Sequence, residues 1–460
     1  MKVLERVLER RTRKKVQIDE MQFGFMLGRG TTDALSIVRQ LQEKYMEMRK
    51  KLFLGFVDLE KAFDGVPCEV VTWALRKLGV EEWLIRVVMA MYERAHTAVR
   101  MKDGNSGEFE VKVGVHQGSV LSPLLFVAVM EVPAQNVKEG LPWELLYADD
   151  LVLMAESMDG LKEKMNKWKE CMETKGLKVN IRKTKVMASG KACGEVERTG
   201  KWPCAVCMKG VGVNSIQCTM CAEWVHQKCR GLRGSLTSVT DTFKCKVCTE
   251  GAADGGNVEF DLGDGVKLEG VKTFCYLGDM LNGEGGSDSA TVAGVRCAWK
   301  KFRELSGVLT RRGVSLKLKG KVDASCVRSV MIYGSETWVM NVEQQRWLER
   351  VEMRMVRWMC RVSLRERKTN DELRKMMGTE PVMDAVKRNS LRCFGHVLRN
   401  DESDCLRRVM EMIVEGSRGR GRPRKTWLKV VEEEMRARGL TRGVAENRAK
   451  RRRLSWAPQG

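Results

Sequence analysis

Three aspartates follow apolar segments, where an unpaired carboxylate is costly to bury. Asp58 comes directly after the apolar run KLFLGFV, and Asp149 and Asp150 lie in YADDLVLM, which predicts a tight turn between two strands. Adjacent carboxylates in such a setting repel each other unless they are protonated, solvated or neutralised by a metal ion. The alternative interpretation of YADD is an ordinary Asp-containing hairpin turn.

Taken together, the two segments fit a single reaction. Phosphoryl transfer to a primer 3′-hydroxyl uses two divalent ions about 4 Å apart, held by carboxylates on neighbouring strands. One ion lowers the pKa of the attacking hydroxyl, and the other holds the triphosphate and stabilises the leaving pyrophosphate. Magnesium binds through a few carboxylates together with substrate phosphates. The sequence therefore predicts two catalytic Mg²⁺ ions at Asp58, Asp149 and Asp150.

A second chemical group consists of eight soft ligands within 45 residues of sequence. Their spacing is C-x2-C, x10, C-x2-C, x4, H-x2-C, x15, C-x2-C, and the ligands are Cys204, Cys207, Cys218, Cys221, His226, Cys229, Cys245 and Cys248. Paired CxxC steps favour tetrahedral zinc, and eight ligands are enough for two closed structural sites. Disulfides are the alternative, but the N-terminus MKVLERVLERRTRKK is charged where a secretory signal needs an apolar core. We expect two structural Zn²⁺ ions.

A third set, Cys393, His396 and Cys405, has irregular spacing and lacks a fourth ligand. Zinc sites of the structural kind use four ligands. We therefore interpret His396 as a helix residue packed in the C-terminal region and not as a metal ligand.

Composition and charge exclude several classes of protein. The 460 residues leave room for two or three domains, and 43% hydrophobic with 31% charged residues describes a globular chain. No apolar run approaches the roughly 20 residues that cross a bilayer, so we expect no membrane partner. The net charge of +22 is concentrated in residues 295–460, which hold 40 Lys and Arg against 20 Asp and Glu. Such a basic region indicates a nucleic-acid partner, with solubility as the alternative.

The order of predicted elements indicates an α+β fold. Strands are expected at 51–59, 109–115 and 144–155, and helices at 31–50, 68–80, 81–95 and 161–176, the first capped by Thr31 or Thr32. The cysteine-rich insert and a Gly- and acid-rich linker follow, and after about residue 290 the chain is basic, helical and dotted with tryptophans. We divide the chain into residues 1–199, an insert at 200–249, a linker and return to the sheet at 250–285, and a helical basic region at 286–460.

These residues stand in segments that resemble the reverse transcriptases, and more closely those of non-LTR (LINE-type) retrotransposons. The resemblance is carried by segments in the order of that family: QFGFMLGRGTTDA (22–34) in the fingers, FVDLEKAFDGVP (56–67) as motif A, GVHQGSVLSPLLF (114–126) as motif B, YADDL (147–151) as motif C, GLKVNIRKTKVM (176–187) as motif D and FCYLGDML (274–281) as motif E. LRCFGHVLR (391–399) and GRGRPRKTW (419–427) are similar to the tail of these reading frames, so the resemblance covers nearly the whole chain except the insert.

This resemblance implies a right-hand polymerase with partial fingers (within 1–199, with the palm) and a helical thumb. It implies an RNA-directed DNA polymerase that uses an RNA template, a DNA primer or target, and dNTPs. Asp58 and Asp149 would be the principal metal ligands and Asp150 the supporting one. Compared with members of this family, the chain begins in the middle of the fingers and no endonuclease precedes it. We therefore expect an N-terminally incomplete element.

The resemblance also assigns substrate contacts. Phe63 is in the position of the aromatic that crowds the sugar 2′ position and selects dNTPs; an ordinary core phenylalanine is the alternative. Gln117 and Gly118 match positions that contact the incoming nucleotide and the template. Lys183 matches a proton donor to pyrophosphate, with a solvated surface lysine as the alternative, and Arg29 is a candidate contact to phosphate or template.

The cysteine-rich insert resembles a PHD-type finger, because its histidine is the fifth ligand and Trp224 stands two residues before it. In that family the first and third ligand pairs share one ion and the second and fourth pairs the other. Between Cys207 and Cys218 the sequence lacks the aromatic and acidic residues that histone readers use. Chromatin or another protein is therefore a partner to be considered, and histone reading is not favoured.

The basic tail contains RGRP, which resembles an AT-hook, although a flexible linker that contacts phosphates is the favoured interpretation. RAKRRR near the end is either a nuclear-import signal or a phosphate-binding patch. We expect a nuclear protein, with the cytoplasm as a second location. The alternative function for the whole chain is a catalytically inactive, truncated or domesticated copy that binds nucleic acid or chromatin through its zinc finger and tail.

Overall fold

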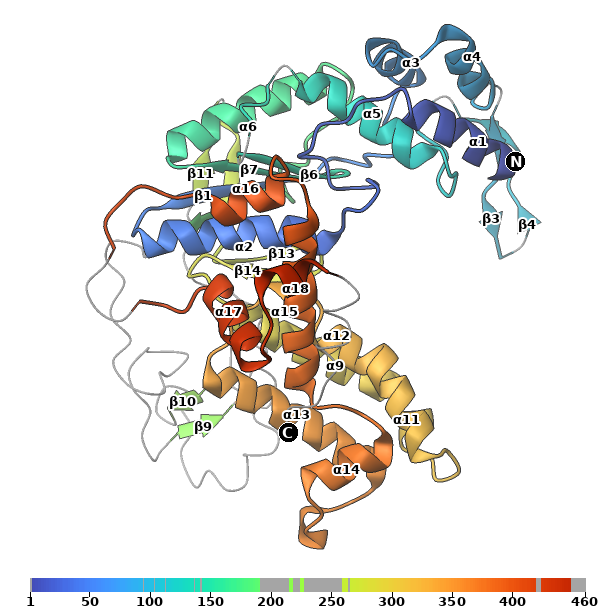
Figure 1. Ribbon diagram of the computed structural model, residues 1–460. Helices are drawn as coiled ribbons and strands as arrows, with labels where there is room; N and C mark the ends of the chain where they lie inside the picture. Colours follow the sequence, from blue (N-terminus) through green and yellow to red (C-terminus); the bar gives the residue numbers. More distant parts are fainter. Residues whose placement is uncertain are drawn as a thin grey trace.

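A six-stranded mixed sheet forms the centre of the protein (Figure 1). The computed structural model describes residues 2–93, 95–102, 104–111, 113–135, 137–140, 143–190, 215–217, 224–226, 259–263, 265–418 and 423–447. The strand order across the sheet is β11 (Glu259–Asp261), β12 (Lys267–Gly270), β8 (Lys185–Ser189), β1 (Leu52–Val57), β7 (Asp150–Ala155) and β6 (Glu144–Tyr147). All pairs are antiparallel except β12 with β8.

Strand β1 is buried on both faces because its side chains alternate between two hydrophobic cores. Leu52, Leu54 and Phe56 belong to one core, while Phe53 and Val57 contact the other. A continuous apolar run such as LFLGFV is typical of a strand covered on both sides. The central position of β1 therefore follows from the lack of polar residues in it.

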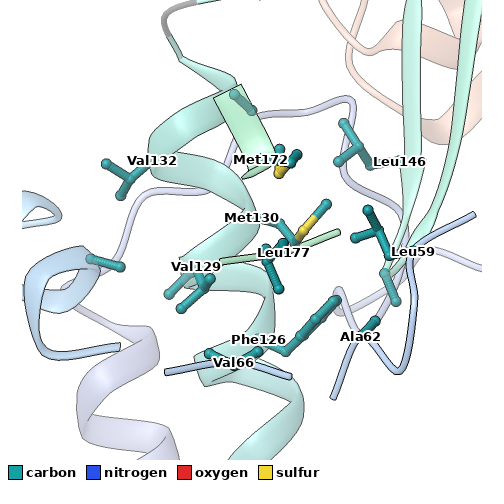
Figure 2. Packing of buried hydrophobic residues seen from close by; sticks show 14 of the residues in the cluster. Leu59, Ala62, Val66, Phe126, Val129, Met130, Val132, Leu146, Met172 and Leu177 are labelled. Carbon is teal, nitrogen blue, oxygen red and sulfur yellow. The ribbon is translucent and has the colours of Figure 1, made fainter. Parts of the chain in front are cut away.

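The first core lies between the sheet and helices that extend away from it (Figure 1). Helix α6 packs on β1 and β7, α5 packs on α6, and the helices of this core are α1 (Lys2–Arg13), α3 (Cys68–Lys77), α4 (Glu82–Ala90), α5 (Ser122–Ala134) and α6 (Met158–Glu173). In Figure 2, Phe126 and Met130 of α5 lie among Leu59, Val66 and Leu177. Two short hairpins, β2 (His96–Thr97) with β5 (Phe109–Glu110) and β3 (Arg100–Met101) with β4 (Gly104–Asn105), stand beside these helices.

The second core joins the beginning and the end of the described chain. Helix α2 (Thr31–Glu47) lies on the opposite face of the sheet. Four helices near the C-terminus complete this core, with α16 packed on α2 and α18 packed on α15: α15 (Val382–Arg399), α16 (Cys405–Glu411), α17 (Trp427–Ala437) and α18 (Arg442–Glu446). Lys44 donates hydrogen bonds to the carbonyls of Met410 and Met412 at 3.0 and 2.7 Å. Glu43 accepts one from the Trp427 N–H at 2.8 Å. Two charged side chains near the C-terminal end of α2 thus bind the backbone of the C-terminal segment.

A third core lies within residues 290–386 and is formed mainly by helices, including the start of α15. The others are α9 (Asp288–Glu304), α10 (Ser306–Leu309), α11 (Leu316–Val322), the π-helix η2 (Asp323–Arg328), α12 (Ser329–Met331), α13 (Val342–Cys360) and α14 (Asn370–Met377), with the 3-10 turns η3 (Ser335–Thr337) and η4 (Leu364–Glu366). The hairpin of β13 (Thr273–Tyr276) and β14 (Asp279–Asn282) connects this unit to the rest. Buried Asp279 accepts from Arg39 of α2 at 2.8 Å and from the Trp338 indole at 3.2 Å, so three parts of the chain meet at one carboxylate.

The structure confirms the predicted mixture of helices and strands and most of their positions. Two details differ. The N-cap of α2 is Gly30 and not Thr31 or Thr32. The Gly30 N–H donates to the Asp33 carboxylate at 2.8 Å. The strand expected at 109–115 is only Phe109–Glu110, because the chain then turns to bond with residues 63–66. No helix in the described part of the chain is long and apolar enough to cross a membrane.

The region predicted as one helical unit at 286–460 is divided between two cores in the structure. Residues 290–386 form the third core, whereas residues 391–445 complete the second core against α2.

Of residues 191–258, the structure describes β9 (Ser215–Gln217) and β10 (Trp224–His226), which pair antiparallel. The chain leaves the sheet at the end of β8 and re-enters at β11, two strands away and running in the opposite direction.

The burial of Glu43 predicts that the stability of the docked C-terminal helices depends on pH. Burial raises its pKa from 4.5 to about 7, so the unfolded state ionises first and the protein loses stability as pH rises from about 4.5 to 7. Glu43→Gln keeps an acceptor for the Trp427 N–H and cannot ionise. We expect it to stabilise the protein at pH 8 by on the order of 1–3 kcal/mol and to have little effect at pH 4.5.

Urea unfolding at the two pH values measures this difference. Glu47→Gln, one turn further along α2, is the matched control because it removes the ion pair with Arg418 and should give no gain in stability. Equal pH dependence in wild type and Glu43→Gln would contradict the assignment.

Candidate active site

The pairing of β1 with β7 brings the three aspartates together. Val57 is opposite Leu151, so Asp58, the next residue, continues towards Asp150. Tyr147 pairs with Asp150 and leaves Ala148 and Asp149 as a two-residue hairpin loop. Ala148 has a φ of +59°, which is the pattern of a type II′ turn. Asp58 from β1 and the two aspartates of the hairpin therefore lie at the same end of the sheet.

The carboxylates influence one another's protonation. Desolvation raises the pKa of Asp150 to about 6, and the negative charges of Asp149 and Asp58 add to that rise. The pKa of Asp149 is also raised, chiefly by desolvation and further by Asp58, while Lys183 opposes the shift. Upward pKa shifts of this kind are expected for neighbouring carboxylates that lack enough positive charge to balance them.

Asp58 is held by the segment that follows α6. Asn180 donates its N–H to the Asp58 carbonyl at 2.8 Å, and the hydroxyl of Thr184, a fully buried residue, lies 3.3 Å from the Asp58 nitrogen and accepts from it. Lys183 places its Nζ 3.5 Å from Asp58 Oδ2. The turn between Asn180 and Thr184 thus fixes the backbone of Asp58 and brings a cation to its side chain.

The donor set suits a divalent cation of the magnesium type. Among the described residues Asp58 Oδ2 is buried without a hydrogen-bond partner, and the pKa values of Asp149 and Asp150 are raised by desolvation and further by like charge. Among the residues that the structure describes, no group of three or more His, Cys, Asp or Glu side chains lies close enough together to hold a metal ion by itself, and this includes Asp58, Asp149 and Asp150. Mg²⁺ usually binds one or two carboxylates with water and phosphate oxygens, so these aspartates fit a site that a substrate completes.

The segment of Phe63 is bonded to the predicted motif B segment, because the Val115 N–H donates to the Phe63 carbonyl at 2.9 Å. The Phe63 ring stacks on Phe126, with centroids 4.4 Å apart and planes at 13°, and meets Phe25 edge-on at 6.1 Å. Because Phe126 is fully buried, it fixes the orientation of Phe63. Gln117 donates from Nε2 to Asp64 at 2.8 Å. Gly118 has a φ of +80° and open space where a Cβ would lie, so a ligand can approach its backbone.

Arg29 and His396 make contacts within the protein. Arg29 forms an ion pair with Asp404 at 2.9 Å and lies over the Phe23 ring at 4.7 Å, which favours a role in packing. His396 Nε2 lies 3.2 Å from Asp33, between α15 and α2. Cys393 and Cys405 are buried in the second core. The interpretation of His396 as a packed helix residue agrees with this arrangement.

The zinc prediction falls mainly on residues outside the described part of the chain. His226 is the last residue of β10 and is partly buried. The other predicted ligands lie outside the described residues: Cys204, Cys207, Cys218, Cys221, Cys229, Cys245 and Cys248.

Sequence reasoning missed a contact from helix α1 to the loop that carries Gln117 and Gly118. The Glu5 carboxylate accepts from the Val120 N–H at 2.7 Å and from the Ser119 hydroxyl at 3.0 Å. The bond from Val120 is the main cause of the lowered pKa of Glu5. Nothing in the sequence pairs this glutamate with Val120, a residue 115 positions away.

Comparison with known proteins gives one family match and several relatives. A family model described as reverse transcriptase (RNA-dependent DNA polymerase) matches residues 1–238. The Pol polyprotein of the R2 retrotransposable element from Nasonia vitripennis is 27% identical over 197 residues, 40% of this chain and 19% of that protein. The R2DM protein of Drosophila melanogaster is 29% identical over 188 residues, 39% and 18%. The RNA-directed DNA polymerase of the mobile element jockey from Drosophila funebris is 29% identical over 184 residues, 37% and 20%.

The matches span about a fifth of the length of these relatives. Among solved structures, a telomerase from Candida tropicalis aligns with 98% of this chain and 56% of its own, at 13% identity and a TM-score of 0.35. A score this low carries no argument about the fold.

The raised pKa of Asp150 predicts a link between pH, metal and stability. Because its pKa in the folded protein, about 6, lies above the ordinary 3.8, the metal-free protein loses stability as pH rises from about 4 to 6. Asp150→Asn should therefore raise the melting temperature of the metal-free protein at pH 8 and not at pH 4. Added Mg²⁺ should stabilise the wild type at pH 8 and progressively less below pH 6.

Thermal unfolding with and without Mg²⁺ measures both effects. Asp159→Asn, an exposed aspartate at the start of α6, is the control and should retain the full response to Mg²⁺. If Asp150→Asn behaves like Asp159→Asn, then the three aspartates do not share a cation.

Proposed function

The chain belongs to the reverse transcriptase (RNA-dependent DNA polymerase) family, and we propose that it extends a DNA primer on an RNA template as the polymerase of a non-LTR retrotransposon. Its relatives are the R2 and jockey element proteins, which supports a nucleotidyltransferase of that kind. The observation that carries the proposal is the β1–β7 pairing, which sets Asp58 beside Asp149 and Asp150.

The chemistry would be divided among a few residues. Asp58 and Asp149, with Asp150 in support, would hold divalent ions of the Mg²⁺ type, which when bound activate the primer hydroxyl and stabilise the leaving pyrophosphate. Lys183, 3.5 Å from Asp58 Oδ2, would donate a proton to that pyrophosphate. Phe63, held against Phe126, would block the 2′-hydroxyl of a ribonucleotide and so select dNTPs.

The rest of the chain fits the parts of a right-hand polymerase. The sheet with α5 and α6 would be the palm, α1 to α4 with the short hairpins would contribute fingers, and the helices of the third core would be the thumb. Gln117 and the open backbone of Gly118 would contact the incoming nucleotide and the template. Arg29, paired with Asp404, would support the fingers segment from within the protein.

We further propose that residues 200–249 form a PHD-type zinc finger with two structural Zn²⁺ ions. The support is the ligand spacing, since eight soft ligands in CxxC pairs suit two tetrahedral sites. The position between β8 and β11 supports a separate unit inserted into the sheet. Its partner would be chromatin or another protein, and the basic C-terminal region supports a nuclear location and contact with nucleic acid.

Primer extension tests the proposed activity. The purified protein should incorporate dNTPs on an RNA template annealed to a DNA primer, only when Mg²⁺ is present. Asp149→Ala should reduce the rate by at least about 1000-fold, because the carboxylate that holds the cation is lost. Asp159→Ala, ten residues along the chain and exposed, should keep the wild-type rate.

Two other results are informative. Equal rates for Asp149→Ala and wild type would show that the incorporation has another source. A wild-type protein that binds the primer–template without extending it would favour the alternative, an inactive copy that acts by binding nucleic acid.

Native mass spectrometry tests the zinc finger. The full chain should carry two Zn²⁺ ions, and a combined Cys204→Ser and Cys207→Ser variant should lose one of them. The matched control, Cys297→Ser at an exposed cysteine in α9, should keep both. A wild-type mass without zinc would rule the finger out, since a segment of about 50 residues has too small a core to fold without metal.

A further inference from the structure

The hairpin that carries Asp149 is bordered by an extra segment of backbone. Residues 21–24 run beside β6, where Leu146 donates its N–H to the Met21 carbonyl at 3.0 Å and accepts from the Phe23 N–H at 2.8 Å. Gln22 lies between these bonds in a parallel bridge with Leu146 and is only 2% exposed. The segment thus extends the sheet by one short bridge next to the catalytic turn.

The side chain of Gln22 bonds directly to that turn. Its Oε1 accepts two buried hydrogen bonds, from the Ala148 N–H at 3.0 Å and from the Gly24 N–H at 2.8 Å. Gly24 packs so closely that a Cβ on it would lie 2.1 Å from the Ala148 nitrogen. One buried carboxamide oxygen therefore connects two chain segments 126 residues apart at the residue before Asp149.

Ala148 needs such a contact because of its backbone. With a φ of +59° it adopts the left-handed conformation that L-residues other than Asn, Asp and Gly rarely take. A positive φ at this position of a two-residue loop normally calls for glycine. Strained residues of this kind persist where the surrounding structure holds them, and they occur often at functional sites.

We propose that Gln22 is a positioning residue for Asp149, acting through the Ala148 N–H to hold the two-residue loop in its strained form. The proposal deepens the polymerase function above and rests on it. Gln22 touches no substrate in this role. It sets the position of the Asp149 carboxylate relative to Asp58. A catalytic group that is misplaced by about 1 Å costs about 100-fold in rate.

Two substitutions of similar size separate the hydrogen bond from the packing. Gln22→Met fills the space and cannot accept, whereas Gln22→Glu keeps an acceptor oxygen in either protonation state. Gln42→Met is the matched control: Gln42 is equally buried, on α2, and donates to the Asn282 carbonyl at 3.3 Å. Both methionine variants lose one buried polar side chain, so both should lower the melting temperature.

Steady-state kinetics with Mg²⁺ gives the first readout. We expect Gln22→Met to lower kcat about 10- to 100-fold with KM for dNTP within about threefold of wild type. Gln22→Glu should recover most of the loss, and Gln42→Met should keep the wild-type kcat. A kcat for Gln22→Met within threefold of wild type overturns the proposal, and so does an equal loss in Gln42→Met.

Amide hydrogen exchange in the metal-free protein gives a second readout that needs no activity. The Ala148 amide should exchange about tenfold faster or more in Gln22→Met than in wild type, and at the wild-type rate in Gln42→Met. Unchanged exchange at Ala148 in Gln22→Met overturns the proposal. If the wild-type protein extends no primer, the polymerase function fails, while the exchange result still decides whether Gln22 holds the turn.

Discussion

The antiparallel pairing of β1 with β7 is the interaction on which the site depends. Its register, Phe53 with Ala155 through Val57 with Leu151, decides which end of β1 meets the hairpin. A shift by one residue would turn every side chain of β1 to the opposite core and move Asp58 away from the turn. Because both faces are buried by large side chains, the hydrophobic cores that stabilise the sheet also fix the position of the carboxylates.

The sequence alone predicted those features of the structure that depend on local residue patterns. Apolar runs predicted β1 and β7, helical periodicity predicted α2 and α6, and the two carboxylate segments were predicted to lie on neighbouring strands. It was insufficient where distant contacts decide. Arg29 pairs with Asp404, 375 residues away, a contact that no local pattern indicates. Likewise, the helical region after residue 286 is divided by its packing partners, which local hydrophobic pattern cannot reveal.

The three loops around the site are held by the same kind of hydrogen bond. In each, a polar side chain bonds to the backbone of the loop: Glu5 at Val120, Gln22 at Ala148 and Thr184 at Asp58. Backbone groups look identical in every sequence, so no residue pattern identifies the partner of such a side chain. The bonds are also well suited to their task, because a buried and satisfied polar group specifies one geometry while an apolar contact permits several.

The second core has a consequence for how the protein is made. It joins residues 21–56 with residues 391–445, so α2 and one face of the sheet are synthesised long before the helices that cover them. On a ribosome the nascent chain would expose that apolar surface until α17 and α18 emerge, and contacts of such sequence separation form slowly. During most of translation one face of the sheet therefore lacks the helices that bury it, which is the kind of exposed apolar surface that makes a chain prone to aggregation.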